Sequence, residues 1–179
     1  MNKIRVLIVD DSFFMQTAIK TILSNDPILE IAGIAKNGLE AITKIKELKP
    51  DVVTIDINMP FLDGIKSIQL IMDECPTPIV VISAYTTDKD SEKTIAALSA
   101  GAVDFIGKPD GEVSTNLKQY TWEIIKKIKL AASANVKRLP FQLKKELHKP
   151  VVTTQAGNLV VLGISTGGPS TLKQLFSLL

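Results

Sequence analysis

Short runs of Val, Ile and Leu alternate along the chain with longer segments in which apolar residues recur every three or four positions. The runs cover residues 4–9, 29–35, 52–55, 79–82 and 103–106, and helix-period segments cover 13–23, 39–48, 65–72 and 89–98 between them. A run that is apolar throughout, rather than alternating, indicates a strand buried on both faces, as in a parallel sheet covered by helices. Five such β–α units predict a doubly wound α/β domain over residues 1–125.

The pattern continues beyond this domain. A fifth helix is predicted over about 115–134, with Leu117, Ile124, Ile125 and Ile128 on one stripe. Residues 126–156 are interpreted as the end of this helix and a linker. A new strand at 159–164, a Gly-rich turn and a helical pattern over 171–179 then predict that a second α/β domain begins at residue 157.

Charge separates the same regions. The 179 residues carry a net charge of +2, but residues 1–125 hold 12 basic and 18 acidic side chains, a net −6, whereas 126–149 hold 8 basic and 1 acidic, a net +7. Such a basic run can indicate nucleic acid or a membrane surface. Without a helix-turn-helix pattern or interleaved aromatic residues, we expect a solvated linker and no nucleic-acid partner. Contact with an acidic partner, including the first domain itself, stays open.

The chain carries no pattern that predicts export or membrane insertion. The apolar run at the N-terminus is too short for a signal peptide, and the longest uncharged stretch, 151–172, is broken by four Gly and one Pro. Cys75 is the single cysteine, which excludes an internal disulfide, and we interpret it as a buried small hydrophobe. These features predict a cytoplasmic protein.

Five polar residues fall at the carboxyl ends of four predicted strands. Asp10 and Asp11 close the first strand, Asp56 the third and Ser83 the fourth, and Lys108 follows the fifth. Carboxyl ends of parallel strands meet at one edge of the sheet. Three carboxylates together favour Mg²⁺, a lysine can hold a phosphoryl group, and a carboxylate can form an aspartyl-phosphate. Solvated loop acids are the alternative for any one of these residues.

The segments VLIVDDS, DINMPFLDG, VVISA and AGAVDFIGKP resemble the motifs of response-regulator receiver domains, which have a flavodoxin-like fold. The resemblance implies that Asp56 is the phosphoacceptor and that Asp10, Asp11 and Asp56 bind Mg²⁺ together with the backbone carbonyl of Asn58. A phosphatase of the haloacid-dehalogenase type is the rival interpretation of Asp56. That chemistry needs a second Asp two residues later, where this chain has Asn58.

The same resemblance assigns the remaining groups. It implies that Lys108 contacts the phosphoryl group, that Ser83 forms the switch hydrogen bond to it, and that Phe105 occupies the aromatic switch position. Leu62 stands where Met is commoner in the family, and Pro60 and Pro109 match prolines that shape the site loops.

A second motif lies at LVVLGISTGGPS. A buried strand leads into Gly163 to Gly167, so that Ser165 would stand at a sharp turn before a helix, where a nucleophilic hydroxyl is often placed. A helix cap and a phosphate-binding turn are the alternatives. A receiver, a basic linker and this turn in order resemble the chemotaxis protein-glutamate methylesterases (the CheB family). That family demethylates chemoreceptor glutamates, often deamidates receptor glutamines, and uses a serine at the position of Ser165.

The resemblance also implies what is missing. In the family the catalytic His and Asp follow the nucleophile, whereas this chain ends at Leu179 and its one histidine, His148, precedes Ser165 in the linker. A serine without a base is a poor nucleophile. We therefore expect a fragment without esterase activity of its own, phosphorylated by a histidine kinase and related to enzymes that act on chemoreceptors. A stand-alone phospho-receiver that acts as a binding module is the alternative.

Overall fold

The computed structural model describes residues 3–60, 62–84, 88–108 and 117–136. These belong to one compact unit, Met1–Pro140. Pro109, His148 and Ser165 lie outside the described residues, as do the strand predicted at 159–164, the turn from Gly163 to Gly167 and the helix predicted at 171–179.

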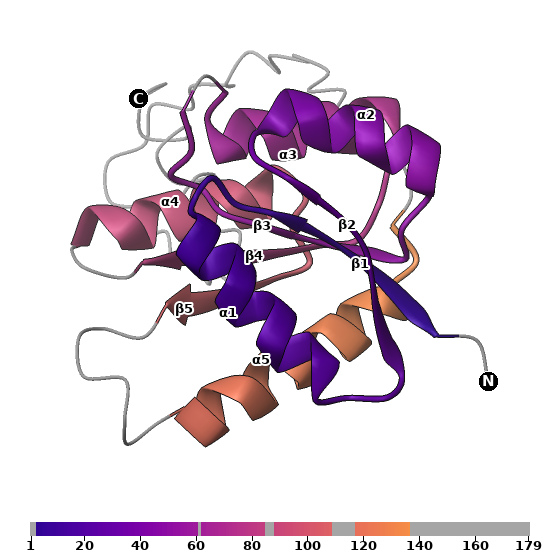
Figure 1. Ribbon diagram of the computed structural model, residues 1–179. Helices are drawn as coiled ribbons and strands as arrows, with labels where there is room; N and C mark the ends of the chain where they lie inside the picture. The colour runs from indigo at the N-terminus through magenta and orange to yellow at the C-terminus, as the bar shows by residue number, and fades with distance from the viewer. Residues whose placement is uncertain (1–2, 61, 85–87, 109–116, 137–179) are drawn as a thin grey trace, which may run out of the picture. The chain divides into compact units, whose positions relative to one another are not determined.

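Five strands form one parallel sheet, and a helix follows each of them (Figure 1). The strands lie in the order β2-β1-β3-β4-β5. They are β1 (Ile4–Val9), β2 (Leu29–Ala35), β3 (Val52–Ile55), β4 (Ile79–Ala84) and β5 (Asp104–Lys108), and the helices are α1 (Phe13–Ser24), α2 (Gly38–Leu48), α3 (Gly64–Glu74), α4 (Asp88–Ser99) and α5 (Leu117–Ala132). This confirms the predicted doubly wound, flavodoxin-like α/β fold.

Each face of the sheet packs against its own set of helices. On one face, Leu7, Val53 and Val81 join α2, α3 and α4 in one buried cluster. On the other, Ile8, Val80 and Ile82 join α1 and α5 in a second cluster. Figure 1 shows α2 and α3 above the sheet and α5 below it. Successive residues of one strand thus enter opposite cores, which is why the strands are apolar at every position.

The chain reverses its direction of winding between β1 and β3. β2 lies on one side of β1, while β3, β4 and β5 follow on the other, with Val9 paired to Ile55 at the carboxyl ends. The crevice outside such a reversal is where open α/β sheets bind ligands. The first side chains beyond this pairing are those of Asp10 and Asp56.

Two expectations need correction. β4 and β5 both end two residues later than predicted, at Ala84 and Lys108, because Ser83 and Ala84 pair with Gly107 and Lys108. Lys108 is therefore the last residue of β5. Cys75 is partly buried rather than buried, although burial still raises the pKa of its thiol above the usual value. Among the described residues, no helix is both long and apolar enough to span a bilayer.

Candidate functional site

Three carboxylates meet where β1 and β3 end. Asp10, Asp11 and Asp56 each offer an oxygen within 4.8 Å of the others. The backbone fixes two of them, because the Asp10 N–H donates to the Ala35 carbonyl at 3.1 Å and the Asp56 N–H donates to the Val9 carbonyl at 3.0 Å. Asp10 and Asp56 are buried and Asp11 is exposed. The cluster thus opens to solvent on the side of Asp11.

Lys108 is the counter-charge to this cluster. Its Nζ lies 2.7 Å from an Asp56 oxygen and 3.1 Å from an Asp10 oxygen, with only 14% of its side chain exposed. Burial alone would lower the pKa of the ammonium, but the hydrogen bond to Asp56 and the charges of Asp56 and Asp10 outweigh it and raise that pKa. Lys108 is therefore fully protonated at neutral pH.

For Asp10, burial outweighs the nearby positive charge in its effect on the pKa. Burial raises the pKa of its carboxyl, and the nearby Asp56 charge adds to this, while Lys108 and the Ser12 N–H, which donates to Asp10 Oδ1 at 2.9 Å, lower it. The net pKa lies above its ordinary value, because burial beside the Asp56 carboxylate disfavours the charged form. A cation beside Asp10 would relieve this penalty.

Asn58 and Ser83 complete the rim next to Asp56. The Asn58 N–H donates to Asp56 Oδ1 at 3.3 Å, and its side-chain Nδ2 lies 3.5 Å from the hydroxyl of Ser83. Ser83 is buried in β4, next to the site. Phe105, on β5, is partly buried and packs against the core cluster beneath α2, α3 and α4.

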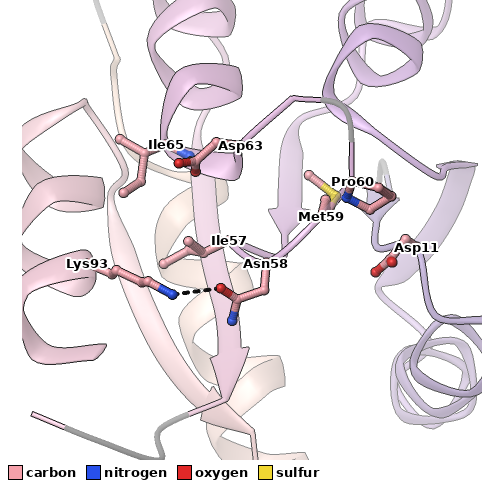
Figure 2. A pocket seen from close by; sticks show the side chains of 8 residues that line it. All are labelled: Asp11, Ile57, Asn58, Met59, Pro60, Asp63, Ile65 and Lys93. Atoms are coloured by element: carbon pink, nitrogen blue, oxygen red, sulfur yellow. Dashed lines mark hydrogen bonds between the residues drawn. The ribbon is translucent and has the colours of Figure 1, made fainter. Parts of the chain in front are cut away.

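An open pocket of about 530 Å³ lies beside these groups. Figure 2 shows Asn58 between Lys93 and Asp11, with the Lys93 ammonium pointing toward the Asn58 amide. Lys93 Nζ, from α4, donates to Asn58 Oδ1 at 2.9 Å. The pocket is lined by Asp11, Ile57, Asn58, Met59, Pro60, Asp63, Ile65 and Lys93.

Gly64, the first residue of α3, packs closely against the loop that carries Asn58. A Cβ at Gly64 would lie 2.5 Å from both the Asp56 carbonyl oxygen and the Ile57 Cα, closer than real side chains come. Asp63 caps α3 by accepting the Ile65 N–H at 2.9 Å. The N-terminus of α3 therefore packs directly on the backbone of the candidate acceptor.

Two further residues were not found from the sequence. Gln16 is buried in α1 and donates from Nε2 to the Asp10 carbonyl at 2.7 Å. The sequence feature that could have indicated Gln16 is its position, as a polar residue, on the apolar stripe that includes Ile19 and Leu23. Lys93 left no such signal, because it lies among the polar residues of a charged helix.

A family model described as the response regulator receiver domain matches residues 6–117. The chain belongs to this family. The response regulator domain of Thermotoga maritima CheB, a solved structure, is 46% identical, with a TM-score of 0.68 over 75% of this chain and 99% of that one. The receiver domain of the putative regulator NarL from Mycobacterium tuberculosis is 27% identical, with a TM-score of 0.60 over 72% of this chain and 98% of that one.

Two curated relatives that extend beyond the receiver are named as the same kind of enzyme. A protein-glutamate methylesterase/protein-glutamine glutaminase 2 of Carboxydothermus hydrogenoformans is 46% identical over 98% of this chain and 51% of its own length. One from Thermotoga maritima is 44% identical over 96% of this chain and 50% of its own length. The chain thus spans about half the length of the curated relatives it matches.

Proposed function

We propose that this chain is the phosphorylation-controlled regulatory part of a chemotaxis protein-glutamate methylesterase, with Asp56 as the phosphoacceptor. The observation that carries the phosphoacceptor role is the contact of one buried lysine with two buried carboxylates: Lys108 with Asp10 and Asp56. An ion pair of this kind at the reversal point of the sheet is suited to phosphoryl transfer, which needs positioning and charge neutralisation above all.

The proposed reaction forms a mixed anhydride on Asp56. An oxygen of the Asp56 carboxylate attacks the phosphorus of the donor, a new O–P bond forms, and the bond to the leaving group breaks with its electron pair. The Lys108 ammonium, 2.7 Å from Asp56, is placed to turn from the carboxylate to an oxygen of the arriving phosphoryl group. Because Lys108 is already protonated, it supplies this charge without a proton transfer.

The carboxylates fit a divalent cation. Asp10, Asp11 and Asp56 offer oxygens within 4.8 Å of one another, and oxygen is the ligand type that Mg²⁺ prefers. We propose that these three carboxylates and the backbone carbonyl of Asn58 hold Mg²⁺. When bound, the ion would offset the charge of the carboxylates and of the phosphoryl oxygens. The raised pKa of Asp10 supports this, because its charged form lacks full compensation from Lys108.

The signal is proposed to leave the site through Ser83 and Phe105. The hydroxyl of Ser83 would exchange its contact with Asn58 for a hydrogen bond donated to the phosphoryl group. β4 would carry this shift to β5, because Ser83 pairs with Gly107, two residues after Phe105.

The names of the relatives support the wider role. They name protein-glutamate methylesterases and protein-glutamine glutaminases. Together with the resemblance to the CheB family, this leads us to propose a chemotaxis histidine kinase as phosphodonor and chemoreceptor glutamates as the substrate of the whole enzyme. Ser165 as the esterase nucleophile, the domain limits at 125 and 156, and the cytoplasmic location all stay predictions.

A stand-alone phospho-receiver remains the second candidate function. The mass of the native protein in its source cell separates the two candidates, because about twice 19.5 kDa supports the enzyme.

The phosphoacceptor is tested by intact-mass spectrometry after incubation with acetyl phosphate and Mg²⁺. We expect one phosphoryl group on the wild type and none on Asp56→Asn. Asp73→Asn, which removes an exposed acid of α3, is the matched control and should be labelled like the wild type. Normal labelling of Asp56→Asn would refute the assignment.

A further inference from the structure

Lys93 is the basic side chain among the described residues that line the pocket beside Asp56. Among the eight described residues that line it, only Lys93 carries a positive charge, while Asp11 and Asp63 are acidic and Ile57, Met59, Pro60 and Ile65 supply apolar surface. The pocket therefore combines one cation with an apolar wall. Such a lining suits a small organic group that ends in a negative charge.

Lys93 is linked to the Asp56 carboxylate through one residue, Asn58. Its Nζ donates to Asn58 Oδ1 at 2.9 Å, and the Asn58 N–H donates to Asp56 Oδ1 at 3.3 Å. Lys108 Nζ contacts the other carboxylate oxygen of Asp56, Oδ2, at 2.7 Å. Lys108 thus contacts the carboxylate directly, whereas Lys93 is connected to it through Asn58 and lines the open pocket.

We propose that Lys93 is a specificity-determining residue that selects phosphodonors whose leaving group is an anion, such as acyl phosphates. The proposal rests on the proposed function of Asp56. In an in-line displacement, the leaving group departs on the side of the phosphorus opposite the attacking Asp56 oxygen. The pocket that receives the departing group would then present the Lys93 ammonium to it.

The chemistry of the donor decides the sign of the effect. With acetyl phosphate, the P–O bond to the acetyl group breaks, the electron pair stays on that oxygen, and acetate leaves as an anion with no proton transferred. With phosphoramidate, the nitrogen is protonated before reaction, the P–N bond breaks, and ammonia leaves uncharged. The Lys93 ammonium attracts the first leaving group as its charge develops and repels the positively charged nitrogen of the second.

The test measures rates of Asp56 phosphorylation by the two donors at saturating Mg²⁺. Lys93→Met keeps the length of the side chain and removes its charge. We expect the rate with acetyl phosphate to fall about two- to fivefold, the range for one partly exposed charge pair, and the rate with phosphoramidate to stay the same or rise. Lys93→Arg should restore the wild-type ratio of the two rates, and Lys93→Glu should shift it further than Lys93→Met.

Two controls separate this proposal from others. Lys66→Met removes an exposed lysine of α3, so it changes the net charge equally and should leave the ratio unchanged. Asp56→Asn should abolish labelling from both donors, which tests the function separately. If Lys93→Met slows both donors equally, or changes only the Mg²⁺ concentration at half-maximal rate, Lys93 acts on site structure and the proposal is wrong.

Discussion

Replacing Lys108 by Met should lower the free energy of unfolding measurably, because the acidic cluster then lacks its counter-charge. The substitution keeps most of the side-chain volume and removes the ammonium, whereas Asp10 and Asp56 stay buried with side chains 1% and 7% exposed. Two carboxylates at most 4.8 Å apart repel each other by at least about 3 kcal/mol at an effective dielectric constant of 20. Breaking a buried ion pair by removing one partner typically costs about 3–5 kcal/mol. We expect a loss in this range at neutral pH without divalent cations.

The pH and Mg²⁺ dependence follow from the same charges. Without Lys108, the pKa of Asp10 should rise further above its usual value. Protonation then removes the uncompensated charge, and the deficit should shrink as the pH falls through the raised pKa toward about 3.8. Mg²⁺ should stabilise Lys108→Met more than it stabilises the wild type, because no ammonium competes for the carboxylates. Each tenfold gain in Mg²⁺ affinity adds about 1.4 kcal/mol at saturating ion.

The assay is urea unfolding followed by circular dichroism, with and without MgCl₂, at several pH values. Lys46→Met is the matched control, because Lys46 pairs with Glu74 on the surface and its loss should leave the free energy of unfolding almost unchanged. Wild-type stability of Lys108→Met, or a smaller response to Mg²⁺ than in the wild type, would refute the reasoning.

Three further predictions address the same unit. Asp10→Asn should remove the cost of ionising a buried carboxyl whose pKa is raised. Without Mg²⁺, the free energy of unfolding of the variant relative to wild type should therefore be greatest above that pKa and decline as the pH falls toward 3.8, and calorimetry should show weakened Mg²⁺ binding. Gly64→Ala should lose about 1–3 kcal/mol in urea unfolding, because its Cβ would lie 2.5 Å from backbone atoms that cannot move aside. Burial raises the pKa of Tyr120 to about 12, so wild-type stability should fall by roughly 2–3 kcal/mol between pH 10 and 12 as the unfolded chain ionises, and Tyr120→Phe should lose this part of the decline.

The sequence predicted the sheet well because burial on both faces leaves an apolar run that few other structures require. The carboxyl ends of the strands were predicted correctly as the positions of Asp10, Asp11, Asp56 and Ser83, since each of these residues directly follows or ends such a run. The end of β5 was misjudged because Gly107 and Lys108 are held in the strand by pairing with β4, a tertiary contact without a hydrophobic signal.

Side chains that reach the site from helices were harder to predict. The contact between Lys93 and Asn58 spans 35 residues and depends on where α4 lies relative to the end of β3. A lysine on a charged helix is typical of a solvated face, so periodicity alone gives no reason to bring it to the site. Gln16 is different, because a polar residue in an apolar stripe must be paired once it is buried.

The two lysines beside Asp56 allow folding and chemistry to be examined separately. Lys108 is enclosed with two buried acids, so its removal should change stability, Mg²⁺ response and phosphorylation together. Lys93 lies at an open pocket and donates to the exposed Asn58 amide, so water can replace this hydrogen bond when the ammonium is removed. Lys93→Met should therefore unfold within about 1 kcal/mol of the wild type. A change in donor preference without a change in stability would then reflect the ammonium itself, because a disturbed fold would alter both.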